Sequence, residues 1–133
     1  MNQNRNEPRN HIWELWSPTW NFDKATFDET AQSPGNLDLV DIVIHSYRHR
    51  FGDLDGDPKP DKIEAKLANR PSISAPTIVM EGRDDGVDPP SEEDFDQPHF
   101  TGDYRRIVTE GAGHNFPQGA PTAFADAILS LLR

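Results

Sequence analysis

Hydrophobic positions with helical spacing mark the first half of the chain. Trp13, Trp16 and Trp20 stand at i, i+3 and i+7, the spacing of side chains on one helix face. Pro18 interrupts this series, and proline inside a helix removes a hydrogen bond and clashes with the preceding turn. We therefore expect a short helix that ends near Ser17.

Three further helices are expected before residue 70. Asp23 is a suitable N-cap for a helix over 24–32, and Pro34-Gly35 then indicates a turn. The clearest helix covers 37–50, with Asn36 as its cap, and a shorter one covers 61–69. The apolar positions that repeat with helical period in the last two are Leu37, Val40, Ile44, Tyr47, Ile63 and Leu67.

Two short runs after residue 75 predict β-strands, and the first is an apolar run of the size that suits a buried strand. Residues 77–81 (TIVME) and 105–109 (RRIVT) are these runs, and the sequence between them predicts a loop and then an acidic helix from Ser91. An amphipathic helix over 121–132 follows the second run. The order strand, loop, helix, strand, loop, helix predicts an α/β arrangement with two parallel strands.

The composition is lean in apolar residues for a globular protein. Hydrophobic residues make up 34% of the 133, and 12 prolines and 9 glycines add many breaks, so we expect either a loop-rich fold or a fold that lacks part of its core. A net charge of −10 argues against binding to nucleic acid or to anionic membrane surfaces. No apolar run reaches the roughly 20 residues of a membrane helix, and the polar first residues do not form a secretory signal. The expectation is a soluble cytoplasmic protein, and the absence of cysteine excludes disulfides and thiolate catalysis.

Two loops that follow the predicted strands carry an acid and a histidine. The first is 82–89 (GRDDGVDP) and the second is 111–115 (GAGHN). Because the carboxyl ends of parallel strands meet at one edge of a sheet, groups on these loops can come together. A carboxylate on one ring nitrogen orients an imidazole and stabilises its protonated form, and the other nitrogen can then take a proton from a nucleophile or water.

These loops make the last part of the chain resemble the end of an α/β-hydrolase. In that family the catalytic acid follows the penultimate strand in a G-x-x-D pattern, which selects Asp85 after Gly82. The histidine follows the last strand in a G-x-G-H pattern, which selects His114. The order also matches the family order of nucleophile, acid and histidine. The resemblance implies a partial α/β-hydrolase fold over 75–133, in which Asp85 orients His114 as a general base.

The segment before residue 75 resembles, less specifically, the helical cap that this superfamily inserts over its active site. This gives three expected regions: a polar, disordered or frayed tail over 1–11, a cap-like segment over 12–74 and the hydrolase part over 75–133. The cap resemblance implies a small, partly apolar substrate and no cofactor. The residues that it places near the substrate are Trp13, Trp16, Trp20 and Tyr47, together with His45 and Arg48.

The nucleophile part of the family pattern does not occur in these 133 residues. No serine stands in a G-x-S-x-G motif, and neither an HGGG oxyanion loop nor the central strands are present. We therefore expect a truncated hydrolase or one half of a split enzyme, inactive alone, whose partner is a complementary N-terminal half or a second copy. The alternative is a non-catalytic binding module that retains relic catalytic loops. Ester, lactone, epoxide and carbon–halogen substrates all stay open.

Three other patterns compete with this interpretation. Asp84 fits a G-x-D-x-G nucleophile elbow, but an elbow opens directly into a helix and the following VDPP does not. His45 and His49 have the spacing of a metal-binding pair, yet no third ligand accompanies them and cations suit the end of a helix. Pro58 occupies the position where an EF-hand-like loop needs glycine. The carboxylates that suggest such a loop are Asp53, Asp55, Asp57, Asp61 and Glu64. No metal site is expected.

Overall fold

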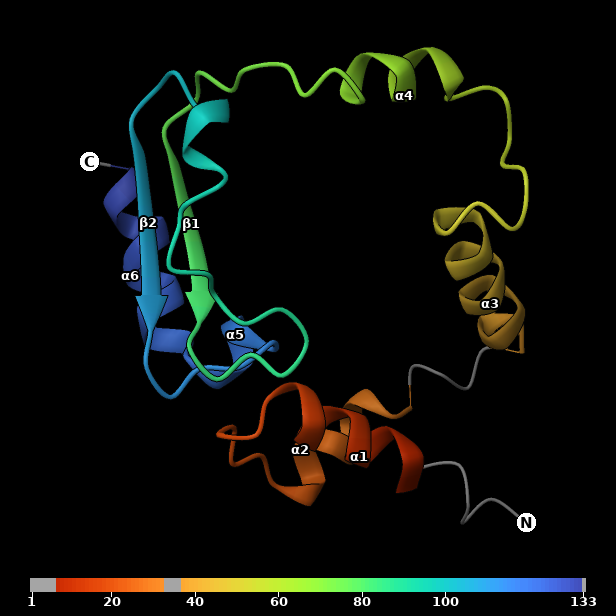
Figure 1. The fold of residues 1–133 in the computed structure, drawn as a ribbon. Coiled ribbons are helices and arrows are strands. Elements are labelled where there is room, and N and C mark those ends of the chain that lie inside the picture. The colour runs from red at the N-terminus through yellow and green to blue at the C-terminus, as the bar shows by residue number, and fades with distance from the viewer. Residues whose placement is uncertain (1–6, 33–36, 133) are drawn as a thin grey trace. The chain divides into compact units, whose positions relative to one another are not determined.

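The computed structural model of the chain describes residues 7–32 and 37–132 (Figure 1). Their backbone contacts divide the chain into two compact units, which are described separately. One unit takes in the described residues up to Phe22 together with those from Ser72 onward, and the other covers those between Asp23 and Pro71. The first unit contains α1 (Glu7–Trp16), β1 (Thr77–Gly82), η2 (Gln97–His99), β2 (Tyr104–Thr109), α5 (Phe116–Gly119) and α6 (Pro121–Leu131).

A two-stranded parallel sheet confirms the predicted strand pair. Thr77 is paired with Tyr104 and the register runs without a break to Gly82 and Thr109, so both strands end at the same edge (Figure 1). An ion pair between Glu81 and Arg106 ties the strands together. Glu81 is level with Val108 in this register, so Arg106 is its diagonal neighbour on the same face.

Helices α5 and α6 pack on each other, and α6 packs against β1. The predicted helix over 121–132 is confirmed, with Pro121 in the first turn, where its missing N–H costs nothing. Ala127 on α6 and Phe116 on α5 are buried, as is Ala112 in the preceding loop. These small buried surfaces form the centre of the first unit.

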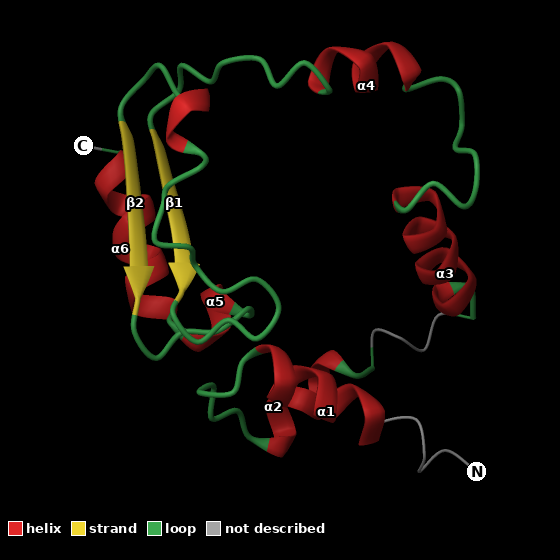
Figure 2. Cartoon of the chain, viewed as in Figure 1, coloured by secondary structure: helices red, strands yellow, loops and turns green. Residues whose placement is uncertain are grey.

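The acidic helix predicted from Ser91 is wrong. Only the short 3₁₀ turn η2 interrupts the long connection between β1 and β2 (Figure 2). Asp94 explains the difference, because its Oδ1 accepts the amides of Asp96 and Gln97 at 3.1 Å each. Side-chain oxygens that bond to nearby amides in this way favour turns over helix. The Tyr104 hydroxyl also donates to Asp94, which holds this turn against β2.

The second unit contains α2 (Lys24–Thr30), α3 (Leu39–Arg50) and α4 (Asp61–Leu67), so all three predicted helices are confirmed with slightly shorter bounds. Asp23 caps α2 as predicted, since its Oδ1 accepts from the Thr26 amide at 2.7 Å. The predicted Pro34-Gly35 turn and the Asn36 cap lie outside the described residues, and the N-cap position of α3 is Asp38. The apolar side chains that repeat with helical period in and beside α3 and α4 are exposed: Leu37, Val40, Ile44, Tyr47, Ile63 and Leu67.

The start of the chain differs from the expected polar tail. Helix α1 already begins at Glu7, inside the stretch 1–11 that the sequence suggested would be frayed, while residues 1–6 lie outside the described part. By its contacts, α1 belongs to the same compact unit as β1 and β2. Within the described residues, no helix is both long and apolar enough to cross a membrane.

Candidate active site

Asp85 and His114 meet beyond the carboxyl ends of the two strands. The Nδ1 atom of His114 lies 2.9 Å from Oδ2 and 3.2 Å from Oδ1 of Asp85. An ionised carboxylate is only an acceptor, so Nδ1 carries the proton and Nε2 is the nitrogen that can accept one. The Asp85 side chain is 13% exposed and that of His114 is 39% exposed, so the acid is enclosed while the ring reaches the surface.

Backbone amides hold the Asp85 carboxylate in place. Its Oδ1 accepts from the amides of Val87 at 2.8 Å and Asp88 at 3.0 Å. Burial raises the pKa of Asp85, but these two amides and the bond to His114 outweigh it, so its pKa lies below the usual value. Asp85 is therefore a fixed anion at neutral pH, suited to orienting an imidazole.

The two loops also bind each other through their backbones. The Arg83 amide donates to the Thr109 carbonyl at 2.9 Å, and the Asp84 amide donates to the Ala112 carbonyl at 2.9 Å. A side chain on Gly82 would meet the Ala112 carbonyl oxygen at 2.3 Å, so only glycine permits this approach. Gly111 has φ +73°, a left-handed conformation that starts the turn toward His114. The G-x-x-D and G-x-G-H patterns thus have local geometric reasons.

Trp16 and Ser17, at the end of α1, contact both loops. The Trp16 carbonyl oxygen accepts from the Gly86 amide at 3.1 Å and the His114 amide at 3.0 Å. Its indole ring stands edge-on to the His114 ring, with centroids 5.2 Å apart. Ser17 is 1% exposed, and its Oγ accepts from the Asn115 amide at 2.8 Å. Sequence reasoning missed Ser17, although glycines beside the acid and histidine, at 86 and 113, signal close backbone approach.

The other predicted substrate-binding aromatics divide between the two units. Trp13 and Trp20 are stacked with centroids 5.0 Å apart, and Phe22 packs against both. Tyr47 lies in the second unit, where it stacks on Phe51 with centroids 6.3 Å apart. His45, from the same helix α3, is stacked on His49. Contact with a substrate stays a prediction for all of these residues.

The competing interpretations gain no support from the geometry. The connection beyond Asp84 contains no helix before η2, which does not fit a nucleophile elbow. His49 directs Nδ1 to the Leu54 carbonyl oxygen at 3.2 Å. Asp57 accepts the Lys59 amide at 3.0 Å, a local turn contact. Among residues 7–32 and 37–132, no three histidine or acidic side chains are grouped as metal ligands.

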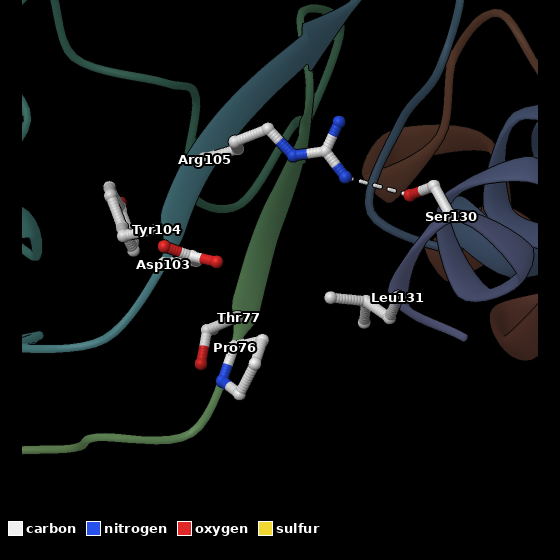
Figure 3. Close-up of a pocket in the computed structure, with 7 residues that line it drawn as sticks. All are labelled: Pro76, Thr77, Asp103, Tyr104, Arg105, Ser130 and Leu131. Atoms are coloured by element: carbon white, nitrogen blue, oxygen red, sulfur yellow. Dashed lines mark hydrogen bonds between the residues drawn. The ribbon is translucent and has the colours of Figure 1, made fainter. Parts of the chain in front are cut away.

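Two surface hollows among the described residues of the first unit are lined by residues other than Asp85 and His114. The larger, of about 500 Å³, is at the opposite end of the strands (Figure 3). There Arg105 donates to Ser130 Oγ at 2.7 Å. The smaller, of about 310 Å³, lies along Glu81, Arg106 and the loop 88–96. The residues of the larger hollow are Pro76, Thr77, Asp103, Tyr104, Arg105, Ser130 and Leu131. Neither of these linings includes a histidine, so the acid–histidine pair stays the candidate site.

The chain is similar to a solved protein from Klebsiella pneumoniae subsp. pneumoniae that is described as a "putative epoxide hydrolase". The two are 39% identical, the match covers 97% of this chain, and the TM-score is 0.86. This chain spans 43% of the length of the Klebsiella protein. No protein-family model and no curated protein matches the sequence. The chain is therefore a mixed α/β protein that shares its fold with part of a protein described as an epoxide hydrolase.

Proposed function

We propose that this chain supplies the acid and histidine of an α/β-hydrolase active site that opens a small, partly apolar epoxide. The observation that carries the proposal is the 2.9 Å contact between Asp85 and Nδ1 of His114 on the loops after two parallel strands. The similarity to the Klebsiella protein supports hydrolysis, and its description puts epoxides ahead of esters, lactones and carbon–halogen compounds.

In the proposed reaction His114 is the general base and Asp85 is the group that orients it. A carboxylate nucleophile bonds to one epoxide carbon while the carbon–oxygen bond breaks, and the released oxygen takes a proton from solvent, which leaves an ester. Nε2 then takes a proton from a water that attacks this ester. When the ester bond breaks, the imidazolium returns the proton to the departing oxygen, so that the diol leaves and the carboxylate is restored. The charge of Asp85 stabilises the imidazolium between these two transfers.

The proposal assigns the nucleophile to a polypeptide segment other than these 133 residues. The family that the chain resembles carries it on an elbow such as G-x-S-x-G or G-x-D-x-G, and epoxide hydrolysis needs the carboxylate of the second. Asp84 fits that second pattern, but no helix follows it before η2. The Klebsiella protein has more than half of its length without a counterpart in this chain, so that part is a suitable donor of the missing segment.

The test measures hydrolysis of styrene oxide and p-nitrophenyl acetate by the chain alone and by a chimera. The chimera joins the chain to the part of the Klebsiella protein that it does not cover. We expect turnover by the chimera. Turnover should be lost in His114→Ala, because the attacking water then lacks its base, and in Asp85→Ala, because the base then lacks its orienting charge. A chimera that folds and turns over equally well with His114→Ala would overturn the proposal. If the chain alone turns over substrate and His114→Ala abolishes that turnover, His114 keeps its proposed role as the base. Water is then the nucleophile in place of a group on another segment.

A second candidate is an interaction module that retains the acid and histidine without catalysis. The observation that favours it is the exposed apolar surface of the described chain, in particular on α3, where Val40, Ile42, Val43 and Ile44 are all exposed. The two-stranded sheet also leaves the outer edge of each strand open to a further strand. The partner would be a complementary N-terminal half or a second copy. Light scattering after gel filtration tests self-association. A chain that is strictly monomeric and also does not bind the remaining segment of the Klebsiella protein would contradict this candidate.

A further inference from the structure

We infer that the end of α1, at Trp16 and Ser17, positions the acid–histidine pair by joining the two loops that carry it. The inference rests on the proposed function for its catalytic consequence, but the positioning itself is a matter of geometry. Asp85 and His114 are 29 residues apart, and their loops must be held within a few tenths of an ångström for the hydrogen bond between them to form.

The first part of the connection is a single backbone oxygen. Trp16 is the last residue of α1, so its carbonyl has no acceptor role within the helix. The oxygen accepts from the amide of Gly86, the neighbour of Asp85, and from the amide of His114 itself. One carbonyl with two lone pairs thus fixes the acid loop and the histidine loop to the same point.

The second part is a buried serine. Ser17 Oγ accepts the amide of Asn115, which follows His114, across a separation of 98 residues. Ser17 is 1% exposed, so water cannot replace this bond without a rearrangement. Asn115 and His114 therefore have adjacent amides bonded to adjacent residues of the α1 end, which fixes the direction in which the histidine loop runs.

Glycine makes both contacts possible. A Cβ on Gly86 would meet the Leu15 carbonyl oxygen at 1.9 Å, and a Cβ on Gly113 would meet Ser17 Cα at 2.5 Å. These are backbone atoms, which cannot move aside as a flexible side chain would. The glycines on either loop are thus explained by the approach of α1, in addition to the turns they make.

The third part is the Trp16 ring, which limits the rotation of the imidazole. It stands at 77° to the His114 ring with centroids 5.2 Å apart, an edge-to-face arrangement. On one side the ring of His114 is held by Asp85 and on another by this indole. Trp16 is accordingly a positioning residue, through its carbonyl for the loops and through its ring for the imidazole.

The experiment compares Gly86→Ala, Ser17→Ala and Trp16→Phe with a matched control, Gly119→Ala. A Cβ on Gly119 meets only the Trp20 side chain, at 3.7 Å or more, so this change keeps the same chemistry without a clash. The direct readout is the ¹⁵N and ¹H NMR signature of the His114 imidazole, assigned by its loss in His114→Ala. The second readout is kcat and KM of the chimera for styrene oxide.

We expect Gly86→Ala and Ser17→Ala to shift the imidazole signature away from the Asp85-bonded form and to lower kcat by between about tenfold and 100-fold, since small misplacements of catalytic groups have effects of this size. KM should change little, and Gly119→Ala should match the parent protein in both readouts. Trp16→Phe keeps the backbone carbonyl and an aromatic ring. Its imidazole signature and its kcat should therefore lie between those of Gly86→Ala or Ser17→Ala and those of Gly119→Ala.

If Gly86→Ala does not fold, Ser17→Ala alone decides the question. A folded Ser17→Ala variant with the parent imidazole signature and the parent kcat would overturn the inference. If His114→Ala leaves turnover unchanged, the proposed function fails, but the imidazole signature still decides whether the end of α1 positions His114. The two failures are therefore distinguishable.

Discussion

Arg106 on β2 reaches across the sheet to Glu81 on β1, and the same guanidinium donates to the Ser91 carbonyl at 2.8 Å. This arrangement ties the start of the long connection after Asp85 to the strand that leads toward His114. The Glu81 carboxylate raises the pKa of Arg106, as expected for a cation held by an opposite charge. The loop with the acid is thus attached to the sheet on one side and to α1 on the other.

Asp85→Asn should abolish most of the hydrolytic activity of the chimera. The amide oxygen can still accept from Nδ1, but it provides no charge for the imidazolium and permits the wrong tautomer. In the serine-protease triad the same change lowers kcat by about 10⁴-fold, and we expect a loss of similar order. Asp88→Asn is the matched control, since it removes a nearby charge that has no contact with His114. Equal rates for the two variants would argue against an orienting role for Asp85.

The stability contribution of Asp85 should disappear in acid. Its folded-state pKa is lower than its unfolded-state value, so the ionised carboxylate stabilises the fold above the unfolded pKa of about 3.9. This contribution is lost as the pH falls through the lowered folded-state pKa. Urea unfolding of the parent and Asp85→Asn between pH 2 and 7 measures the difference in free energy of unfolding. The difference should be constant near neutral pH and shrink below about pH 4; a difference that grows in acid would contradict the assignment.

Gly82→Ala should destabilise the first unit more than Gly119→Ala. The new methyl group would meet the Ala112 carbonyl oxygen at 2.3 Å and that of Gly113 at 2.8 Å, both of them backbone atoms. Forcing a methyl group into a packed site costs about 1–3 kcal/mol, whereas Gly119 offers ordinary contact distances. Thermal unfolding of both variants checks the ranking, and equal midpoints would show that the two loops separate easily.

Tyr104 should ionise only at unusually high pH. Burial and the hydrogen bond to Asp94 raise the pKa of Tyr104 to about 12. The raised value means that its neutral hydroxyl stabilises the fold below the unfolded pKa of about 10, and that this contribution is lost as the pH rises through about 12. In Tyr47→Phe, Tyr104 is the sole remaining tyrosine, so the phenolate absorbance reports it directly. Asp94→Asn in that background should lower the midpoint, and an unchanged midpoint would remove Asp94 as the cause.

The local sequence determined most of the secondary structure, and the resemblance of its two loops to α/β-hydrolase motifs selected the two candidate catalytic residues. Helical periods and caps located all but the shortest helices, and the β-branched runs located both strands. These signals depend only on neighbours within a few residues, so they can be read from the sequence without the fold. The same signals were wrong at 91–96. There Asp94 accepts the amides of Asp96 and Gln97 and the hydroxyl of Tyr104, and the contact with Tyr104 needs β2 in place.

The tertiary structure alone decided what the end of α1 does. The tryptophan spacing indicated a helix, and the resemblance to a hydrolase cap placed these residues near a substrate. Nothing in residues 13–20 indicates that the Trp16 carbonyl accepts amides from positions 86 and 114. These contacts join residues 70 and 98 positions apart in the sequence. A backbone oxygen occurs in every residue, so the residue type does not indicate its role. The sequence by itself therefore determined which acid and which histidine could pair, since their loops carry local patterns. Only the folded chain decided how the pair is held, because the Trp16 carbonyl, the Trp16 ring and the Ser17 hydroxyl have partners that are set by packing.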